Sequence, residues 1–84
     1  MKHANEDDLK KVAALLTQIR KLAGLQERKP GIFYRKSSSF LHFHSDPERG
    51  IFADVKVGKD WVLLPVNTKA ERDTLMEKIG EICG

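Results

Sequence analysis

Apolar residues recur at intervals of three and four near the start of the chain, which is the spacing of one face of an α-helix. The stripe consists of Leu9, Val12, Leu16, Ile19 and Ala23, and is widened by Leu15 and Leu22. Asn5 stands before it as an N-cap, and Gly24 follows it with the conformational freedom that commonly ends helices. The pattern predicts a helix over about residues 6–23, followed by a polar bridge, QERKPG, at 26–31.

From Ile32 to Val66 apolar and polar residues alternate with a period of two, which is typical of strands. The alternation predicts four short strands, at about residues 32–36, 39–44, 51–57 and 61–66. The segments between them are rich in Ser, Gly, Asp and Pro, the residues that favour turns. Such short connections indicate a four-stranded antiparallel meander.

The last predicted element is a second helix, at about residues 69–82. Thr68 and Glu71 have the spacing of a capping box at its start. Each predicted helix is apolar on one side only, so both must cover the same layer. We therefore predict one α+β domain over residues 1–84, a two-layer sandwich in the order helix, four-stranded antiparallel meander, helix, with both helices on one sheet face.

The pairing of the second and third predicted strands follows from which side chains must share the core. A five-residue loop, DPERG at 46–50, aligns Leu41 and Phe43 with apolar positions of the next strand and puts His42 opposite Asp54. A loop one residue shorter would put the histidines beside apolar residues. We favour the five-residue loop because it separates apolar from polar side chains.

This register leaves a mixed aromatic and polar set on the face away from the helices. We expect that face to hold Phe33, Arg35, Phe40, His42, His44, Phe52, Asp54, Lys56, Trp61 and Leu63. The outer face of a half-solvated antiparallel sheet is normally polar. Four strands about 4.8 Å apart and about 17 Å long give a face of roughly 300 Å². A mixed patch of this size indicates a binding surface.

A metal or small-ligand site is one hypothesis for this face. Residues two apart on a strand project the same way, so His42 and His44 could reach one ion, and Asp54 could add a carboxylate from the next strand. Two imidazoles and one carboxylate suit zinc or iron with open coordination positions. The simpler interpretation is two partly exposed histidines, one of them paired with the aspartate, with no cofactor expected.

Catalytic signals are weak. The serine run at 37–39 lies near His42, but a serine run between strands is first of all a turn. No glycine elbow frames a nucleophile, no glycine-rich phosphate loop is present, and Cys83 stands one residue from the end of the sequence. The chain is therefore more consistent with a binding protein than with an enzyme.

The charge of the chain allows two kinds of partner. The 84 residues include 15 Lys and Arg against 12 Asp and Glu, for a formal net charge of +3. Basic residues around aromatic side chains could hold a single nucleic-acid strand, but acidic residues are interleaved with them. Self-association through the open face explains the aromatic residues with fewer assumptions, so we predict a homodimer and keep nucleic-acid binding as an alternative.

The single cysteine and the absence of a long apolar run bear on the compartment. One cysteine cannot form an internal disulfide, which fits a reducing environment. No apolar run approaches the length needed to span a membrane, and the first residues lack the apolar core of a signal peptide. We expect a cytoplasmic protein without a membrane partner.

Residues 30–75 resemble a stretch in small bacterial proteins that share the order F-L-H-F-H, F-A-D-V and T-x-x-E. The resemblance implies a bacterial cytosolic protein, and that family has no established function or catalytic residues to carry over. The predicted order of elements is also similar to frataxin-like folds, which is an analogy of fold alone. Because acidic residues in the first helix are concentrated at positions 6–8, iron delivery has little support here.

Overall fold

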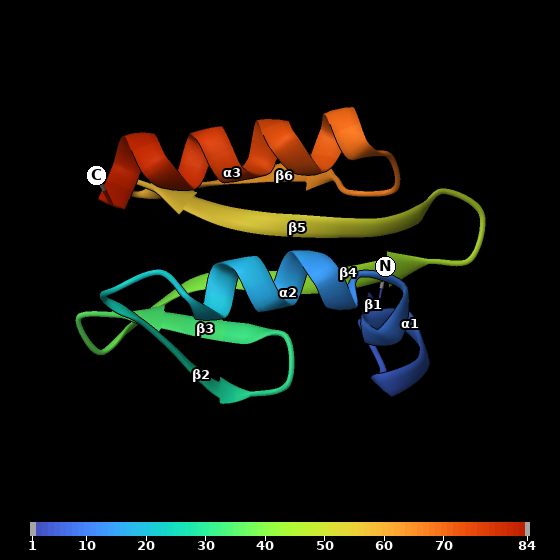
Figure 1. Ribbon diagram of the computed structural model, residues 1–84, viewed down its shortest axis with the longest axis horizontal. Helices are drawn as coiled ribbons and strands as arrows, with labels where there is room; N and C mark the ends of the chain where they lie inside the picture. Colours follow the sequence, from blue (N-terminus) through green and yellow to red (C-terminus); the bar gives the residue numbers. More distant parts are fainter. Residues whose placement is uncertain (1, 84) are drawn as a thin grey trace.

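The apolar stripe at the start of the chain forms two helices rather than one. In the computed structural model, which describes residues 2–83, α1 (Glu6–Lys11) and α2 (Ala13–Arg20) are separated by Val12 (Figure 1). Val12 has φ −116° and ψ 26°, outside helical geometry, and its side chain is only 1% exposed. The predicted continuous helix is therefore wrong at this residue, although the predicted N-cap, Asn5, does cap α1.

The break at Val12 coincides with a contact from the far end of the chain. Arg72, in α3 (Lys69–Cys83), donates a hydrogen bond to the backbone carbonyl of Lys11 at 3.5 Å. Its Nε also donates to the carbonyl of Val66 at 2.9 Å. One side chain thus joins α3, the α1–α2 junction and the segment that follows the last strand.

The remaining regular structure is a single antiparallel sheet of six strands. They are β1 (Lys2–His3), β2 (Leu25–Lys29), β3 (Ile32–Arg35), β4 (Ser38–Asp46), β5 (Gly50–Val57) and β6 (Asp60–Pro65). Their order is β2-β3-β4-β5-β6, and β1 pairs with the end of β4. The α+β class and the antiparallel sheet are confirmed, while β1 and β2 were not predicted. The expected polar bridge contains most of β2, whose charged sequence is typical of an edge strand.

The register favoured for β4 and β5 is the observed one. Leu41 pairs with Val55 and His42 pairs with Asp54, as predicted. The loop itself is shorter than the five residues expected, because β4 and β5 extend to pair Asp46 with Gly50 and leave residues 47–49 between them. Gly58, at the β5–β6 turn, has φ +65°, a value that suits glycine in a two-residue hairpin loop. The alternation of apolar and polar residues along β4 and β5 was therefore sufficient to align them.

Because of a bulge between β3 and β4, three residues expected on the open face lie on the other side of the sheet. Phe33 pairs with Leu41 but Tyr34 pairs with Ser39, so Phe40 is an extra residue in β4. Phe33 and Phe40 are 1% and 4% exposed and belong to the core. The alternation could not place β3, because three consecutive apolar residues, at 32–34, give no period of two.

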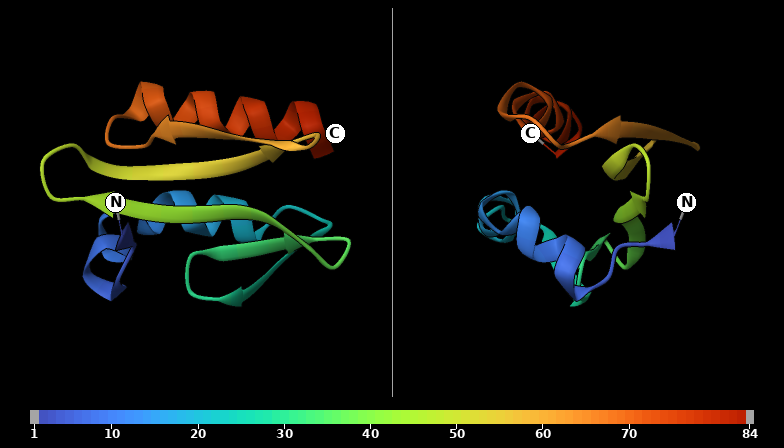
Figure 2. Two further views of the ribbon diagram at one scale, coloured as in Figure 1. Left: turned by 180° about the vertical axis from the view of Figure 1, so that it is seen from behind. Right: turned by 90° about the vertical axis from the view of Figure 1, so that its right-hand side faces the viewer.

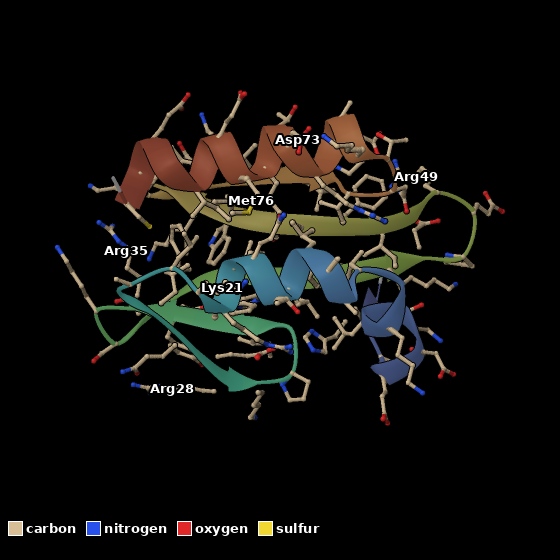
Figure 3. The ribbon with its side chains drawn as sticks, in the orientation of Figure 1. Lys21, Arg28, Arg35, Arg49, Asp73 and Met76 are labelled. Atoms are coloured by element: carbon tan, nitrogen blue, oxygen red, sulfur yellow. The ribbon has the colours of Figure 1, made fainter. Side chains whose placement is uncertain are left out.

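Arg35 also lies on the opposite face of the sheet from the one expected. It lies two residues after Phe33 on the same strand and so shares its face. Its Nη2 donates to the carbonyl of Ile82 at 3.4 Å, near the carboxyl end of α3 (Figure 3). Arg35 therefore lies on the helix side of the sheet.

Helices α2 and α3 lie on the same side of the curved sheet (Figure 2). Thr68 and Glu71 form the predicted capping box of α3, with both hydrogen bonds at 3.1 Å. The core between helices and sheet includes Leu15, Ile19, Leu75 and Ile79 from the helices, with Met76 packed at its margin between α2 and α3 (Figure 3). Within residues 2–83, no helix combines the length and apolar composition needed to cross a bilayer.

Candidate functional site on the open sheet face

The open face is the side of the sheet away from the helices. The strand registers place on it His3, Ile32, Tyr34, His42, His44, Phe52, Asp54, Lys56, Trp61 and Leu63. Seven of the ten residues expected there are present, namely all except Phe33, Phe40 and Arg35. The three histidines of the chain all lie on this one face.

The histidines form a row that leads to the tryptophan. Short β1 pairs His3 with His44, and their ring centres are 6.3 Å apart. The ring centres of His44 and His42 are 6.1 Å apart, and those of His42 and Trp61 are 5.2 Å apart. Four rings from β1, β4 and β6 thus lie in sequence across the face. His3 was not expected on this face, because a two-residue strand is too short to show a period of two.

Hydrogen bonds and charges hold two of the histidines in different ways. The Nε2 of His44 lies 3.7 Å from the Oδ2 of Asp54, while Nε2 of His42 shares a hydrogen bond with the hydroxyl of Ser39. Asp54 is opposite His42 in the register, yet its carboxylate approaches the diagonal neighbour. Burial, followed by the proximity of His44, lowers the pKa of His42, although Asp54 acts in the opposite direction.

This arrangement bears on the metal hypothesis. In the part of the chain that the structure describes, no group of three or more His, Cys, Asp or Glu side chains is placed to hold a metal ion. His42 is turned toward Ser39, and His44 toward Asp54. A shared ion would therefore require at least one of these side chains to rotate and give up its present partner.

The exposed apolar surface of the open face is concentrated on β6. Among residues 2–83, the most exposed large hydrophobic side chains are those of Trp61 and Leu63, at 41% and 42%. They are two residues apart on β6, so both project from the open face. We call these two side chains, with their backbone groups, the β6 patch.

The backbone of the β6 patch points outward as well. β6 is the last strand in the sheet order, and the N–H of Val66 donates to the carbonyl of Ile51 at 3.0 Å. Because antiparallel pairs alternate between hydrogen-bonded and non-hydrogen-bonded, Val62 and Leu64 bond to β5, while Trp61 and Leu63 direct their N–H and C=O groups to the free edge. Natural edges usually carry charge or proline to prevent pairing, and Pro65 limits this one at its end.

Elsewhere on the open face, cations cover the aromatic rings. The guanidinium carbon of Arg49 lies 5.4 Å from the centre of the Phe52 ring, and Phe52 is only 9% exposed. The corresponding distance from Arg28 to Tyr34 is 4.7 Å. Each of these rings has an arginine over it, whereas Trp61, which lies beside the ring of His42, is 41% exposed. This gives limited support to the nucleic-acid alternative, which needs several free rings.

Comparisons with known proteins found no matching family model, no matching curated protein and no matching solved structure. The resemblance of residues 30–75 to small bacterial proteins and the analogy to frataxin-like folds gain no support from them.

Proposed function

We propose that this protein is a non-enzymatic binding module that self-associates through the β6 patch. The observation that carries the proposal is the coincidence, on one free edge strand, of the exposed side chains of Trp61 and Leu63 with outward-facing backbone groups. Edge addition satisfies the backbone groups by hydrogen bonds and the side chains by burial. The proposal needs no cofactor, and we keep the cytoplasm as the expected location because of the single cysteine.

A second copy is the occupant that fits this strand best. An antiparallel pair of identical strands has two-fold symmetry, so one patch serves both partners. With the axis at Val62, Trp61 of one copy stands opposite Leu63 of the other, and the outward N–H and C=O groups of both residues find partners. Because the interface has four backbone hydrogen bonds worth about 1 kcal/mol each and a small apolar area, we expect a dimer of modest affinity.

Sedimentation velocity over a concentration series tests the proposal. We expect the parent protein to shift from monomer to dimer at micromolar concentrations. Trp61→Lys should weaken the dimer at least tenfold, because it places like charges near the axis. Gln26→Lys is the matched control, since Gln26 is an exposed residue on the opposite edge strand and gains the same charge; it should leave the dimer unchanged.

A second variant separates edge pairing from face-to-face packing. Leu63→Pro removes one outward N–H without removing a bond to β5, so it should dissociate an edge-paired dimer more than Leu63→Ala does. Circular dichroism establishes that each variant is folded. A parent protein that stays monomeric at high micromolar concentration contradicts the proposal, and so does a Trp61→Lys variant that keeps its dimer.

A metal site at His42, His44 and Asp54 is the second candidate, and the observation that favours it is the third imidazole, His3, beside His44. Zinc should then raise the melting temperature of the parent protein by mass action. The double variant His42→Ala, His44→Ala should lose that rise. If the parent protein shows no zinc-dependent shift, the metal hypothesis is wrong.

A further inference from the structure

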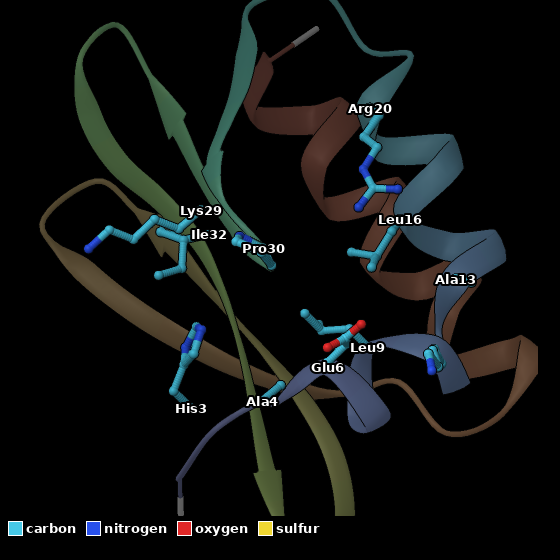
Figure 4. Close-up of a pocket in the computed structure, with 11 residues that line it drawn as sticks. His3, Ala4, Glu6, Leu9, Ala13, Leu16, Arg20, Lys29, Pro30 and Ile32 are labelled. Carbon is cyan, nitrogen blue, oxygen red and sulfur yellow. The ribbon is translucent and has the colours of Figure 1, made fainter.

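A hollow opens beside the other edge of the sheet, between the first two helices and the turn that joins β2 to β3. Its volume is about 730 Å³, within the range of small-molecule sites. Arg20 and Leu16 of α2 face Pro30 across the hollow, and Leu9 and Glu6 of α1 lie at its lower end (Figure 4). None of the proposed contacts of the β6 patch involves this region.

Hydrogen bonds within the chain fix the positions of the walls of the hollow. Arg20 forms two hydrogen bonds with the carboxylate of Glu27, at 2.6 and 3.1 Å. The same carboxylate accepts a hydrogen bond from the N–H of Gly31 at 3.0 Å, which ties the β2–β3 turn to α2. The carbonyl of Gly31 in turn accepts from the N–H of Phe43 at 3.0 Å. The turn is therefore fixed in place before any ligand arrives.

Gly31 also sets how closely the turn approaches α1. It has φ +74°, and a Cβ at this position would lie 2.9 Å from Cδ2 of Leu9. Because Gly31 has no side chain, the turn can pack directly against Leu9. This contact closes the inner end of the hollow.

The lining combines an apolar floor with a rim in which cations predominate. Ala4, Leu9 and Leu16 form part of the floor and are almost fully buried. Three cationic residues, Lys10, Arg20 and Lys29, and the imidazole of His3 line the hollow, against one carboxylate, that of Glu6. Arg20 is already paired with Glu27, so the two exposed lysines supply the excess positive charge. The side chain of Lys29 extends away from the floor in this structure and would have to turn to meet a ligand (Figure 4).

We propose that this hollow binds an amphipathic monoanion, with an aliphatic chain on the apolar floor and a single carboxylate at the lysine rim. The floor removes apolar surface from water, and the rim favours negative charge over positive. Glu6 at the lower end disfavours a second negative group, which selects a monocarboxylate over a dicarboxylate of equal length.

Isothermal titration with decanoate, kept below its micelle concentration, tests the proposal. We expect saturable binding of decanoate, and binding at least tenfold weaker for decanedioate and for decyltrimethylammonium. These two probes share the chain length and differ in charge. Equal binding of all three contradicts the proposal, and so does the absence of saturable decanoate binding.

Two pairs of neighbouring residues provide matched variants. Ala13 lines the hollow and Ala14 does not, although both are exposed on α2. Ala13→Trp should fill the hollow and abolish binding, while Ala14→Trp should leave it intact. Likewise Lys10→Glu should weaken binding at least tenfold and Lys11→Glu should not, because only Lys10 lines the hollow. If both members of a pair behave alike in folded protein, the hollow is not the binding site.

Discussion

His42 illustrates how neighbouring side chains set the properties of a single residue on the open face. Its ring is partly buried, lies between His44 and Trp61, and shares a hydrogen bond with Ser39. Burial, the positive charge that His44 can carry and, less strongly, His3 all disfavour a protonated His42, and only Asp54 favours it. The folded state therefore holds this imidazole neutral more firmly than the unfolded chain does.

This difference predicts a pH dependence of stability. Because the pKa of His42 is lowered in the folded state, the unfolded state takes up a proton first as the pH falls through about 6.5, the ordinary histidine value. The contribution of neutral His42 is fully present above that pH and is lost as the pH falls toward the lowered pKa. His42→Gln should make the unfolding free energy less dependent on pH in this interval. Urea unfolding followed by circular dichroism between pH 5 and 8 measures it, and equal slopes for parent and variant contradict it.

At the level of strands and helices, two glycines differ in the space that a side chain would have. Gly80 lies inside α3, where an added Cβ would meet no atom within 4 Å. Gly50 begins β5 with φ +90°, and an added Cβ would lie 2.5 Å from Oδ1 of Asn67. That oxygen accepts a hydrogen bond from the N–H of Ile51 at 2.9 Å, which links the start of β5 to the segment before α3.

Alanine at the two positions should therefore change stability in opposite directions. Gly80→Ala should raise the unfolding free energy by about 0.5–1 kcal/mol, because alanine loses less backbone entropy in a helix. Gly50→Ala should lower it by about 1–3 kcal/mol, through the positive φ and the displaced Asn67. Chemical denaturation of the two variants against the parent protein measures both. A stabilising Gly50→Ala would show that Asn67 does not hold the start of β5.

Over the molecule as a whole, the helices pack against one face of the sheet, and the core lies between these two layers. Leu41, Phe43, Ala53 and Val55 lie between the sheet and the helices and are fully buried. Arg72 of α3 also links the two ends of the chain, because it donates a hydrogen bond at the junction of the first two helices. A charge placed among these four side chains would be removed from water.

Adjacent residues of β5 test this division of the sheet into two faces. Val55→Asp should destabilise the protein by about 4 kcal/mol or more and unfold much of it, because an unpaired carboxylate would be buried. Lys56→Asp introduces the same side chain one residue later, on the open face, and should remain folded. Thermal melting followed by circular dichroism compares them. Cooperative melting of Val55→Asp at the parent temperature would contradict the buried position of that residue.

Local patterns predicted those features that depend on neighbours along the chain. The caps at Asn5 and Thr68 follow from side chains that bond to backbone groups three residues away. The alignment of β4 with β5 follows from strict alternation, because a slip of one residue would expose every core side chain of the strand. Seven of the ten residues expected on the open face follow from the same argument.

Features that depend on segments distant in sequence could not be read in this way. The row of histidines exists because β1 pairs with the end of β4 and brings His3 beside His44. The bulge at Phe40 moves Phe33 and Arg35 to the helix side, and no local signal marks it. The helix breaks at Val12, where the carbonyl of Lys11 meets Arg72, 61 residues further along the chain. Periodicity reports which face of an element is apolar, but it carries no information on which distant backbone or side chain will satisfy a particular group.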